Sequence, residues 1–349
     1  MRLKSSTNRK IKEYIIVPYL VKIKSNTNYI HYFSFAEYLD QILQASPTKI
    51  EIEFYIVKDI QKPEKLDLKF HFIYGKEKES KIYYERPLLG KLKAKMLIEN
   101  IENKVRIFVN SVYYHLVKLR MDNVYPPGCN LTDITTIKLL EAGYVPVHSG
   151  CVALNNDAIL LFAPPDTGKS LTVLSAVKTG YHFVSEDITI IDKEHAYSCP
   201  LTSTFAHLLP NKSFSFKFHS FASKMGILSY FIKKPKTRIV DVFDNLKINE
   251  KSGIRMVCIL ERGKKGAQKI DENEAFRKLL IINRNEFFYY KNPLVFAYSY
   301  FNPSFNLRRL MEKEEEIIYS ITSKADCFLL KTDNPREYIE LLSDTLQKT

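Results

Sequence analysis

The chain has 349 residues, which is long enough for two domains or for one large α/β domain. Hydrophobic residues make up 45% of it and charged residues 26%, which excludes a disordered, collagenous or coiled-coil protein. The net charge of +13 favours an anionic partner, although the basic residues are spread along the chain and a lysine-rich composition explains them equally well.

The cysteines and the N-terminal segment indicate the compartment. The five cysteines form no Cys-x-x-Cys pair and are odd in number, which argues against a disulfide framework and against a zinc site. The apolar stretch at residues 14–21 contains Pro18 and is too short for a signal peptide, and no run of about 18 uncharged apolar residues occurs. We expect a soluble cytoplasmic protein without a membrane partner.

The first third of the chain predicts a β-rich module. Strands are expected at residues 15–23, 50–57, 68–74 and 105–109, where β-branched and aromatic residues gather. Pro126, Pro127 and Gly128 mark a boundary, because this sequence is not expected inside a helix or a central strand. We therefore predict a β-rich N-terminal domain of unknown role over residues 1–127 and a second domain over residues 128–349.

Strands alternate with helices beyond this boundary. A helix is expected from Asn130 or Thr132 to about Glu141, ended by Gly143. Further strands are predicted at 147–154, 159–162, 183–184, 188–191, 256–260 and 327–330. Further helices are predicted after Gly168, over 307–320, and from 334 to about 346. This alternation predicts an α/β domain with a mixed sheet.

A phosphate-binding loop is predicted between the strand at 159–162 and the helix after Gly168. Residues 163–170 match Gly-x-x-x-x-Gly-Lys-Ser/Thr except at the first position, which is Ala163. Phosphate binding needs backbone N–H groups at a helix N-terminus, a lysine cation and a hydroxyl group for Mg²⁺. Pro164 and Pro165 donate no N–H, but they precede the phosphate-facing part of the loop. The predicted ATP-binding residues are Asp166, Thr167, Gly168, Lys169, Ser170 and Leu171. The alternative is a turn with an incidental lysine.

Two adjacent acids, Glu186 and Asp187, follow the short apolar run at 183–184. A carboxylate at a strand end beside such a loop is suited to ligate the Mg²⁺ that accompanies ATP. A second carboxylate nearby is suited to take a proton from an attacking hydroxyl group. Adjacent acids also occur in ordinary polar turns, and the two residues alone leave that alternative open.

Residues 148–192 resemble the HPr kinase/phosphorylase family, which has a phosphoenolpyruvate-carboxykinase-like nucleotide fold. The resemblance rests on the histidine segment at 147–150, the Gly-Lys-Ser end of the loop at 168–170, Gly180, and the acid pair at the family's spacing. Two positions differ, because the family has glycine at the place of Ala163 and aspartate at the place of Glu186.

The resemblance implies a P-loop kinase domain of the α/β class that uses ATP and Mg²⁺. It would transfer the γ-phosphoryl group to a serine-type hydroxyl on a small protein, a peptide or a small molecule. Lys169 would hold β- and γ-phosphate oxygens, Ser170 and Asp187 would ligate Mg²⁺, Glu186 would accept the proton, and His148 would line the acceptor side. On its own residue type, His148 is equally explained as a half-buried strand histidine.

Several points stay open. Ala163 and Glu186 motivate a second hypothesis, a nucleotide-binding regulatory or scaffold protein without catalysis. A basic nucleic-acid-binding protein is a third hypothesis. It is not favoured, because it rests only on the charge and on the lysine-rich cluster at 233–238. Arg255 and Arg262 flank the strand at 256–260 and are candidates either for neutralising transferred charge or for the surface. The sequence also leaves open the acceptor, a homo-oligomer and a reverse phosphorylase reaction.

Overall fold

The computed structural model describes residues 10–40, 47–120, 124–201, 239, 243 and 246–348, and the chain forms two compact units. Unit 1 comprises Met1–Lys138, Ser213–Lys234 and Phe288–Leu310. Unit 2 comprises Leu139–Lys212, Pro235–Phe287 and Met311–Thr349. Both units are discontinuous in sequence, and the domain boundary at residue 127 stays a prediction.

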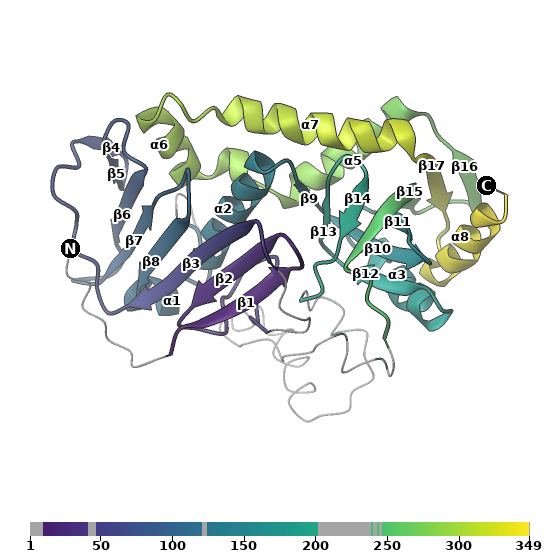
Figure 1. The fold of residues 1–349 in the computed structure, drawn as a ribbon, viewed down its shortest axis with the longest axis horizontal. Coiled ribbons are helices and arrows are strands. Elements are labelled where there is room, and N and C mark those ends of the chain that lie inside the picture. Colours follow the sequence, from purple (N-terminus) through teal and green to yellow (C-terminus); the bar gives the residue numbers. More distant parts are fainter. Residues whose placement is uncertain are drawn as a thin grey trace. The chain divides into compact units, whose positions relative to one another are not determined.

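Unit 1 contains an eight-stranded mixed sheet. Its strands are β1 (Lys12–Val17), β2 (Val21–Ser25), β3 (Ile50–Val57), β4 (Leu68–Phe70), β5 (Ile73–Gly75), β6 (Lys81–Pro87), β7 (Lys93–Glu99) and β8 (Val105–Asn110). They lie in the order β1-β2-β3-β8-β7-β6-β5-β4 (Figure 1). β3 pairs in parallel with β2 and β8, and the other pairs are antiparallel. The strands predicted at 50–57 and 105–109 are confirmed.

Two predicted strands are hairpins. The stretch predicted at 15–23 is broken by a turn after β1, where Pro18 is followed by Tyr19 with φ 62°. The stretch predicted at 68–74 is broken by a turn at His71, with φ 52°. The prediction of a single continuous strand was wrong in both places. A residue with positive φ turns the chain at each of them, and in the first Pro18 also lacks the N–H group that a strand ladder needs.

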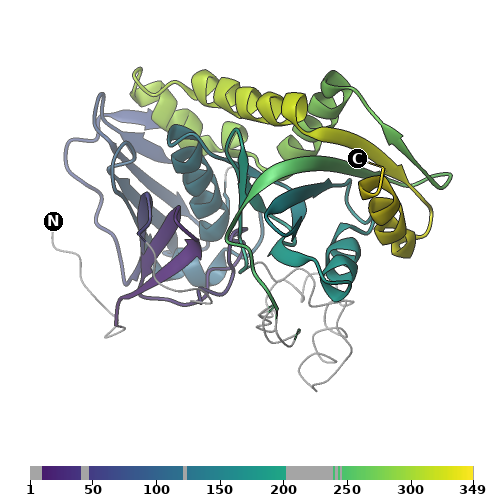
Figure 2. The same ribbon diagram turned by 45° about the vertical axis from the view of Figure 1, so that its right-hand side comes forward.

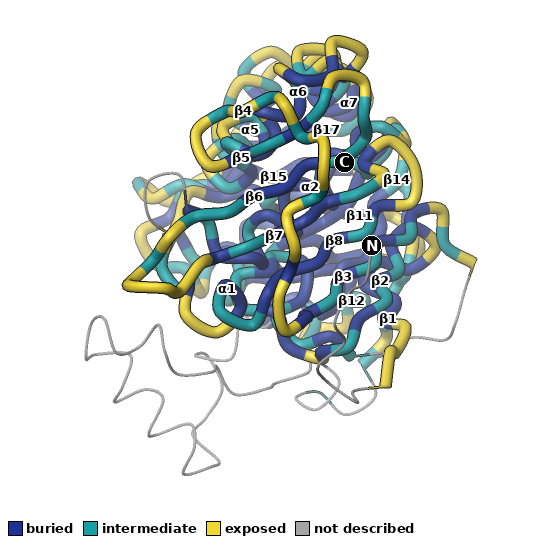
Figure 3. The backbone as a smooth tube through the Cα atoms, turned by 90° about the vertical axis from the view of Figure 1, so that its left-hand side faces the viewer, coloured by how far each residue is buried: buried dark blue, intermediate teal, exposed yellow. Residues whose placement is uncertain are grey.

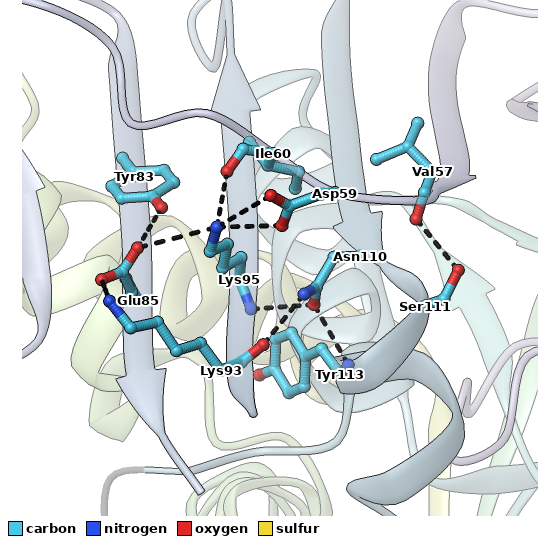
Figure 4. Close-up of polar contacts among 10 residues, drawn as sticks. All are labelled: Val57, Asp59, Ile60, Tyr83, Glu85, Lys93, Lys95, Asn110, Ser111 and Tyr113. Carbon is cyan, nitrogen blue, oxygen red and sulfur yellow. Dashed lines mark hydrogen bonds and ion pairs between the residues drawn. The ribbon is translucent and has the colours of Figure 1, made fainter. Parts of the chain in front are cut away.

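A segment after β3 is fastened to unit 1's sheet by Lys95, as Figure 4 shows. The Lys95 ammonium lies 2.9 Å from the Asp59 carboxylate and donates to the Ile60 carbonyl oxygen at 3.1 Å. Beneath the segment, Tyr83 and Leu97 belong to a buried apolar cluster with Ile60. Lys95 of β7 therefore holds the segment with the apolar Ile60 against the sheet. This explains why a charged side chain in β7 is only 15% exposed.

Asn110 joins the end of β8 to the helix α1 (Ser111–Leu116). Its side-chain oxygen accepts from the backbone N–H groups of Lys95 at 2.9 Å and Tyr113 at 3.1 Å. Its amide donates to the Lys93 carbonyl oxygen at 2.9 Å (Figure 4). This one side chain caps the helix and continues the strand ladder, so the turn from strand to helix is well defined.

Unit 2 contains a nine-stranded mixed sheet. Its strands are β9 (Val145–Val147), β10 (Ser149–Leu154), β11 (Asp157–Phe162), β12 (His182–Ser185), β13 (Thr189–Ile191), β14 (His195–Tyr197), β15 (Lys251–Glu261), β16 (Gly266–Lys269) and β17 (Asp326–Lys331). The long strand β15, green in Figure 2, pairs in parallel with β11 and β17 and in antiparallel with β14. The predicted α/β class with a mixed sheet is therefore present.

The helices after α1 are placed largely as the sequence predicts, with two omissions. Among the described residues they are α2 (Pro127–Glu141), α3 (Lys169–Lys178), α5 (Glu272–Glu286), α6 (Pro293–Phe301), α7 (Leu307–Lys324) and α8 (Tyr338–Leu346). Short 3₁₀ turns are η4 (Tyr289–Lys291) and η5 (Pro335–Glu337). α2 begins at Pro127, so placing this proline outside a helix was wrong: the missing N–H costs nothing at the first helical position. The sequence did not predict α5 and α6.

The core of unit 2 lies between its sheet and the helices α3 and α8. Buried Val173 of α3 and Leu342 of α8 pack in one cluster with Leu161 of β11 and Cys258 of β15. β11 is buried over five of its six residues, as expected for a strand covered on both faces. Figure 3 marks such buried stretches in dark blue.

Two further expectations can be compared with the structure. All five cysteines lie among the described residues, and none is in a disulfide. Within the described part of the chain, every helix is too short or too polar to cross a lipid bilayer.

Candidate functional site

The loop at residues 163–168, here called the Gly168 loop, connects β11 to α3. Gly168 is the N-cap of α3 with φ 118°, a left-handed conformation that side chains rarely adopt. A Cβ atom on Gly168 would lie 2.6 Å from Cβ of Pro335. Thr167 closes the turn by donating from Oγ1 to the Pro164 carbonyl oxygen at 2.8 Å. The predicted strand–loop–helix arrangement is therefore present, and it depends on glycine at position 168.

The N-terminus of α3 is suited to hold an anion. Gly168 provides no side-chain cap, so no carboxylate or hydroxyl of the N-cap competes for the first N–H groups of the helix. The positive end of the helix dipole favours a negative ligand there. Ser170 and Leu171 are half-buried, and Lys169 is 8% exposed.

Lys169 is the centre of a polar cluster in unit 2. Its Nζ atom donates to Oδ1 of Asp187 at 2.9 Å and to the Asp187 carbonyl oxygen at 3.3 Å. The same Nζ atom lies 3.1 Å from Nε2 of His148. His148 Nδ1 lies 3.6 Å from Asp187 Oδ1. The structure thus brings together three of the predicted residues, from the junction of β9 and β10, the start of α3 and the turn after β12.

The charge state of His148 follows from its surroundings. Burial and the Lys169 ammonium lower the pKa of His148 to about 4, against the opposing effect of the Asp187 carboxylate. The imidazole is therefore neutral near pH 7 and accepts a hydrogen bond from Lys169. Nδ1 of the same ring lies 3.5 Å from Nζ of Lys169 and 3.6 Å from Oδ1 of Asp187, so the lysine is within reach of both ring nitrogens.

Glu186 differs from its neighbour in exposure. The side chain of Asp187 is 19% exposed, whereas Glu186 has no exposed surface. The backbone of Glu186 runs close to Gly150 of β10, where an added Cβ atom would lie 3.2 Å from the Glu186 carbonyl oxygen and 2.5 Å from Val173. Gly150 therefore permits the close approach of β10, the acid pair and α3. In this packing Asp187 reaches solvent and Glu186 does not.

The C-terminal part of α5 also reaches this cluster, which sequence reasoning missed. Oδ1 of Asn283 accepts from the backbone N–H of His148 at 3.0 Å. Nδ2 of Asn283 donates to Glu314 of α7 at 2.8 Å, and both side chains are buried. The start of α5 does carry a sequence signal, because Asp271 caps the N–H groups of Asn273 and Glu274.

Glu286, the last residue of α5, lies one helical turn after Asn283. Burial and the Asp187 carboxylate raise its pKa, and the Lys169 ammonium opposes this rise. Glu286 is half-buried, so part of its surface stays in contact with solvent. The charges of the Lys169–Asp187 pair thus act on a third acid that no motif identifies.

The two arginines considered from the sequence have different positions. Arg262 donates to the Asp166 carbonyl oxygen in the Gly168 loop at 3.0 Å and to the Asp333 carbonyl oxygen at 2.6 Å. Arg255 lies 3.3 Å from Asp157 at an exposed position. Arg262 therefore fastens the Gly168 loop, whereas Arg255 forms a surface ion pair. The basic cluster at 233–238 lies outside the described residues.

The donor set is compatible with magnesium bound to a nucleotide. The Asp187 carboxylate and the Ser170 hydroxyl supply oxygen, which Mg²⁺ prefers, and Mg²⁺ on a nucleotide takes one or two protein ligands besides phosphates and waters. Among the described residues, no group of three or more His, Cys, Asp or Glu side chains is placed to hold a metal by itself. Asp187 and Ser170 therefore fit a magnesium ion that is also bound by nucleotide phosphates, rather than a metal ion held by protein side chains alone.

Comparison with known proteins adds little to this description. No protein-family model matches the chain, and no curated protein matches it. Among solved structures it matches the Hpr(Ser) kinase/phosphatase from Coxiella burnetii, with 12% identity over 58% of this chain and 97% of that chain. The TM-score is 0.26, so the similarity is weak and does not establish a shared family.

Proposed function

We propose that unit 2 binds ATP with Mg²⁺ and transfers the γ-phosphoryl group to a serine-type hydroxyl. The observation that supports this most is the contact of Lys169 with Asp187 at 2.9 Å, at the N-terminus of α3 and directly after the Gly168 loop. A lysine, a helix N-terminus and a carboxylate in this arrangement are the parts of a P-loop nucleotide site.

Lys169 and Asp187 exchange partners in this proposal. Without a nucleotide, the Lys169 ammonium forms an ion pair with the Asp187 carboxylate and donates a hydrogen bond to the His148 imidazole. A triphosphate at the start of α3 offers Lys169 phosphate oxygens in place of the carboxylate. Asp187 then becomes available to a magnesium ion. Because Lys169 is 8% exposed, these charge interactions are stronger than they would be in water.

The remaining roles follow from position. Ser170 and Asp187 would hold Mg²⁺, which when bound neutralises charge on the β- and γ-phosphates. Arg262 keeps the Gly168 loop in place through its carbonyl contacts. Neutral His148 orients Lys169 and would line the acceptor side. Most of the rate would come from positioning and charge stabilisation, since phosphoryl transfer needs little covalent chemistry from the protein.

The acceptor is a serine-type hydroxyl on a small protein, a peptide or a small molecule. We propose this class of acceptor from the sequence motif. The described residues of the two units do not discriminate among a protein, a peptide and a small molecule. A cytoplasmic location, where ATP is abundant, belongs to the same proposal.

Phosphate transfer from γ-labelled ATP with Mg²⁺ tests the proposal, using free serine and water as acceptors. Lys169→Ala and Asp187→Asn should each lower the rate at least about a hundredfold, as loss of a transition-state charge contact does. Lys178→Ala, at the far end of α3, is the matched control and should keep the wild-type rate. Transfer by Lys169→Ala at the wild-type rate would refute the site.

A second function, nucleotide binding without catalysis, is favoured by one observation. The residue expected as proton acceptor, Glu186, is fully buried, and such a carboxylate cannot meet an incoming hydroxyl group in this conformation. ATP binding together with no phosphate transfer to water, serine or a serine-containing peptide would support this function over the kinase.

A further inference from the structure

The end of α5 is held against the Lys169 cluster by a specific contact. Asn283 accepts the backbone N–H of His148 at 3.0 Å and donates to Glu314 at 2.8 Å, so its amide is fixed from both sides. Residues three apart on a helix lie on the same face. Glu286 therefore lies on the α5 face that carries Asn283 and meets the cluster.

The charges near Glu286 agree with this placement. Burial and the Asp187 carboxylate raise the pKa of Glu286, and the Lys169 ammonium opposes this rise. Glu286 is half-buried, whereas Glu186 has no exposed surface. Of these two glutamates, Glu286 is the one that an acceptor molecule can reach without a rearrangement of the core.

We propose that Glu286, and not Glu186, accepts the proton of the attacking hydroxyl group. This inference rests on the kinase function proposed above. It assigns a new residue to the reaction and explains how the site can work although Glu186 is buried.

The proton transfer is balanced with the phosphoryl transfer. The acceptor oxygen forms a bond to the γ-phosphorus as its O–H bond breaks. The bond between the γ-phosphorus and the β–γ bridging oxygen breaks, and its electron pair leaves with ADP. The proton passes to the Glu286 carboxylate, which returns it to solvent through its exposed side. With water as acceptor, the same steps give ADP and inorganic phosphate.

Steady-state phosphate release from Mg²⁺·ATP, with water as acceptor, tests this role together with binding of the non-hydrolysable analogue AMPPNP. Glu286→Gln should lower kcat about a hundredfold or more, the usual effect of losing a general base. Its KM and its AMPPNP affinity should stay within about twofold of wild type, because the amide keeps the size of the carboxylate. Glu286→Asp should restore at least a tenth of the lost rate, since it returns a carboxylate. Glu274→Gln, near the start of the same helix, is the matched control and should keep the wild-type kcat.

Each other outcome overturns the inference. An unchanged kcat in Glu286→Gln shows that another group accepts the proton. A loss of AMPPNP affinity in that variant shows a role in binding instead. A wild-type protein that binds AMPPNP but releases no phosphate also contradicts it, because an accessible base would activate water. Failure of the wild type to bind AMPPNP refutes the nucleotide site itself, which distinguishes failure of the proposed function from failure of the Glu286 role.

Discussion

His148 should make the stability of the protein depend on pH, and His148→Gln should remove that dependence. In the folded chain burial and Lys169 lower the pKa of His148 from 6.5 to about 4. Between these values the unfolded chain binds a proton that the folded chain does not. The contribution of His148 to the free energy of unfolding therefore falls as the pH falls through this window, by about 1.4 kcal/mol per unit and about 3 kcal/mol in all.

Urea unfolding followed by circular dichroism, from about pH 7 to about pH 4, measures this effect as the difference between wild type and His148→Gln. Glutamine is neutral throughout and can still accept from Lys169, so the difference isolates the imidazole. Lys169→Met is the second variant. It removes one of the two causes of the low pKa of His148 and leaves Asp187 beside the ring, so the pH dependence should shrink. An identical pH dependence in wild type and His148→Gln would refute the reasoning.

Four further variants test the packing and the pH dependence of stability. Gly168→Ala should lower the free energy of unfolding by about 2–4 kcal/mol in urea titrations, since it combines a strained φ with a contact to Pro335. Gly180 also has positive φ but no neighbour within 4 Å of an added Cβ atom, so Gly180→Ala should lose only the free energy of backbone strain. Equal losses of stability in Gly168→Ala and Gly180→Ala would contradict a clash between residue 168 and Pro335. Burial raises the pKa of Asp133 to about 7 from 3.8, so its contribution to stability is present at low pH and lost as the pH rises to about 7. Asp133→Asn should remove this pH-dependent loss of stability. If wild type and Asp133→Asn differ in unfolding free energy by the same amount at every pH in this range, the prediction is wrong. Lys95→Met should cost about 1–2 kcal/mol in the same titrations by releasing the segment after β3, whereas no change would show that the ion pair is not needed there.

Elements with a local signal could be predicted from the sequence. The strand before the Gly168 loop and the helix after it are set by an apolar run and a Gly-Lys-Ser sequence within about 20 residues. β3 and β8 are rich in β-branched and aromatic residues, which alternate in part with Glu51, Glu53 and Arg106. β6 and β7 were missed, since partners such as Lys95 with Asp59 become evident only after folding.

The site could be predicted only in part. The sequence identified His148, Lys169 and Asp187, because they lie near the loop in the chain or in the family pattern. It could not identify Asn283 or Glu286, since Asn283 meets His148 across 135 residues and no local pattern specifies which helix returns there. Nor could it show which of two adjacent acids is exposed, because the packing of Gly150 against the acid pair and α3 decides this.

The most direct test of a nucleotide site at the Gly168 loop is calorimetric titration of Mg²⁺·AMPPNP into wild type and Lys169→Ala. Loss of a charge-assisted contact worth about 1.5–3 kcal/mol predicts that the variant binds at least about tenfold more weakly. Equal affinity in the two proteins, or no binding to the wild type, would contradict the account.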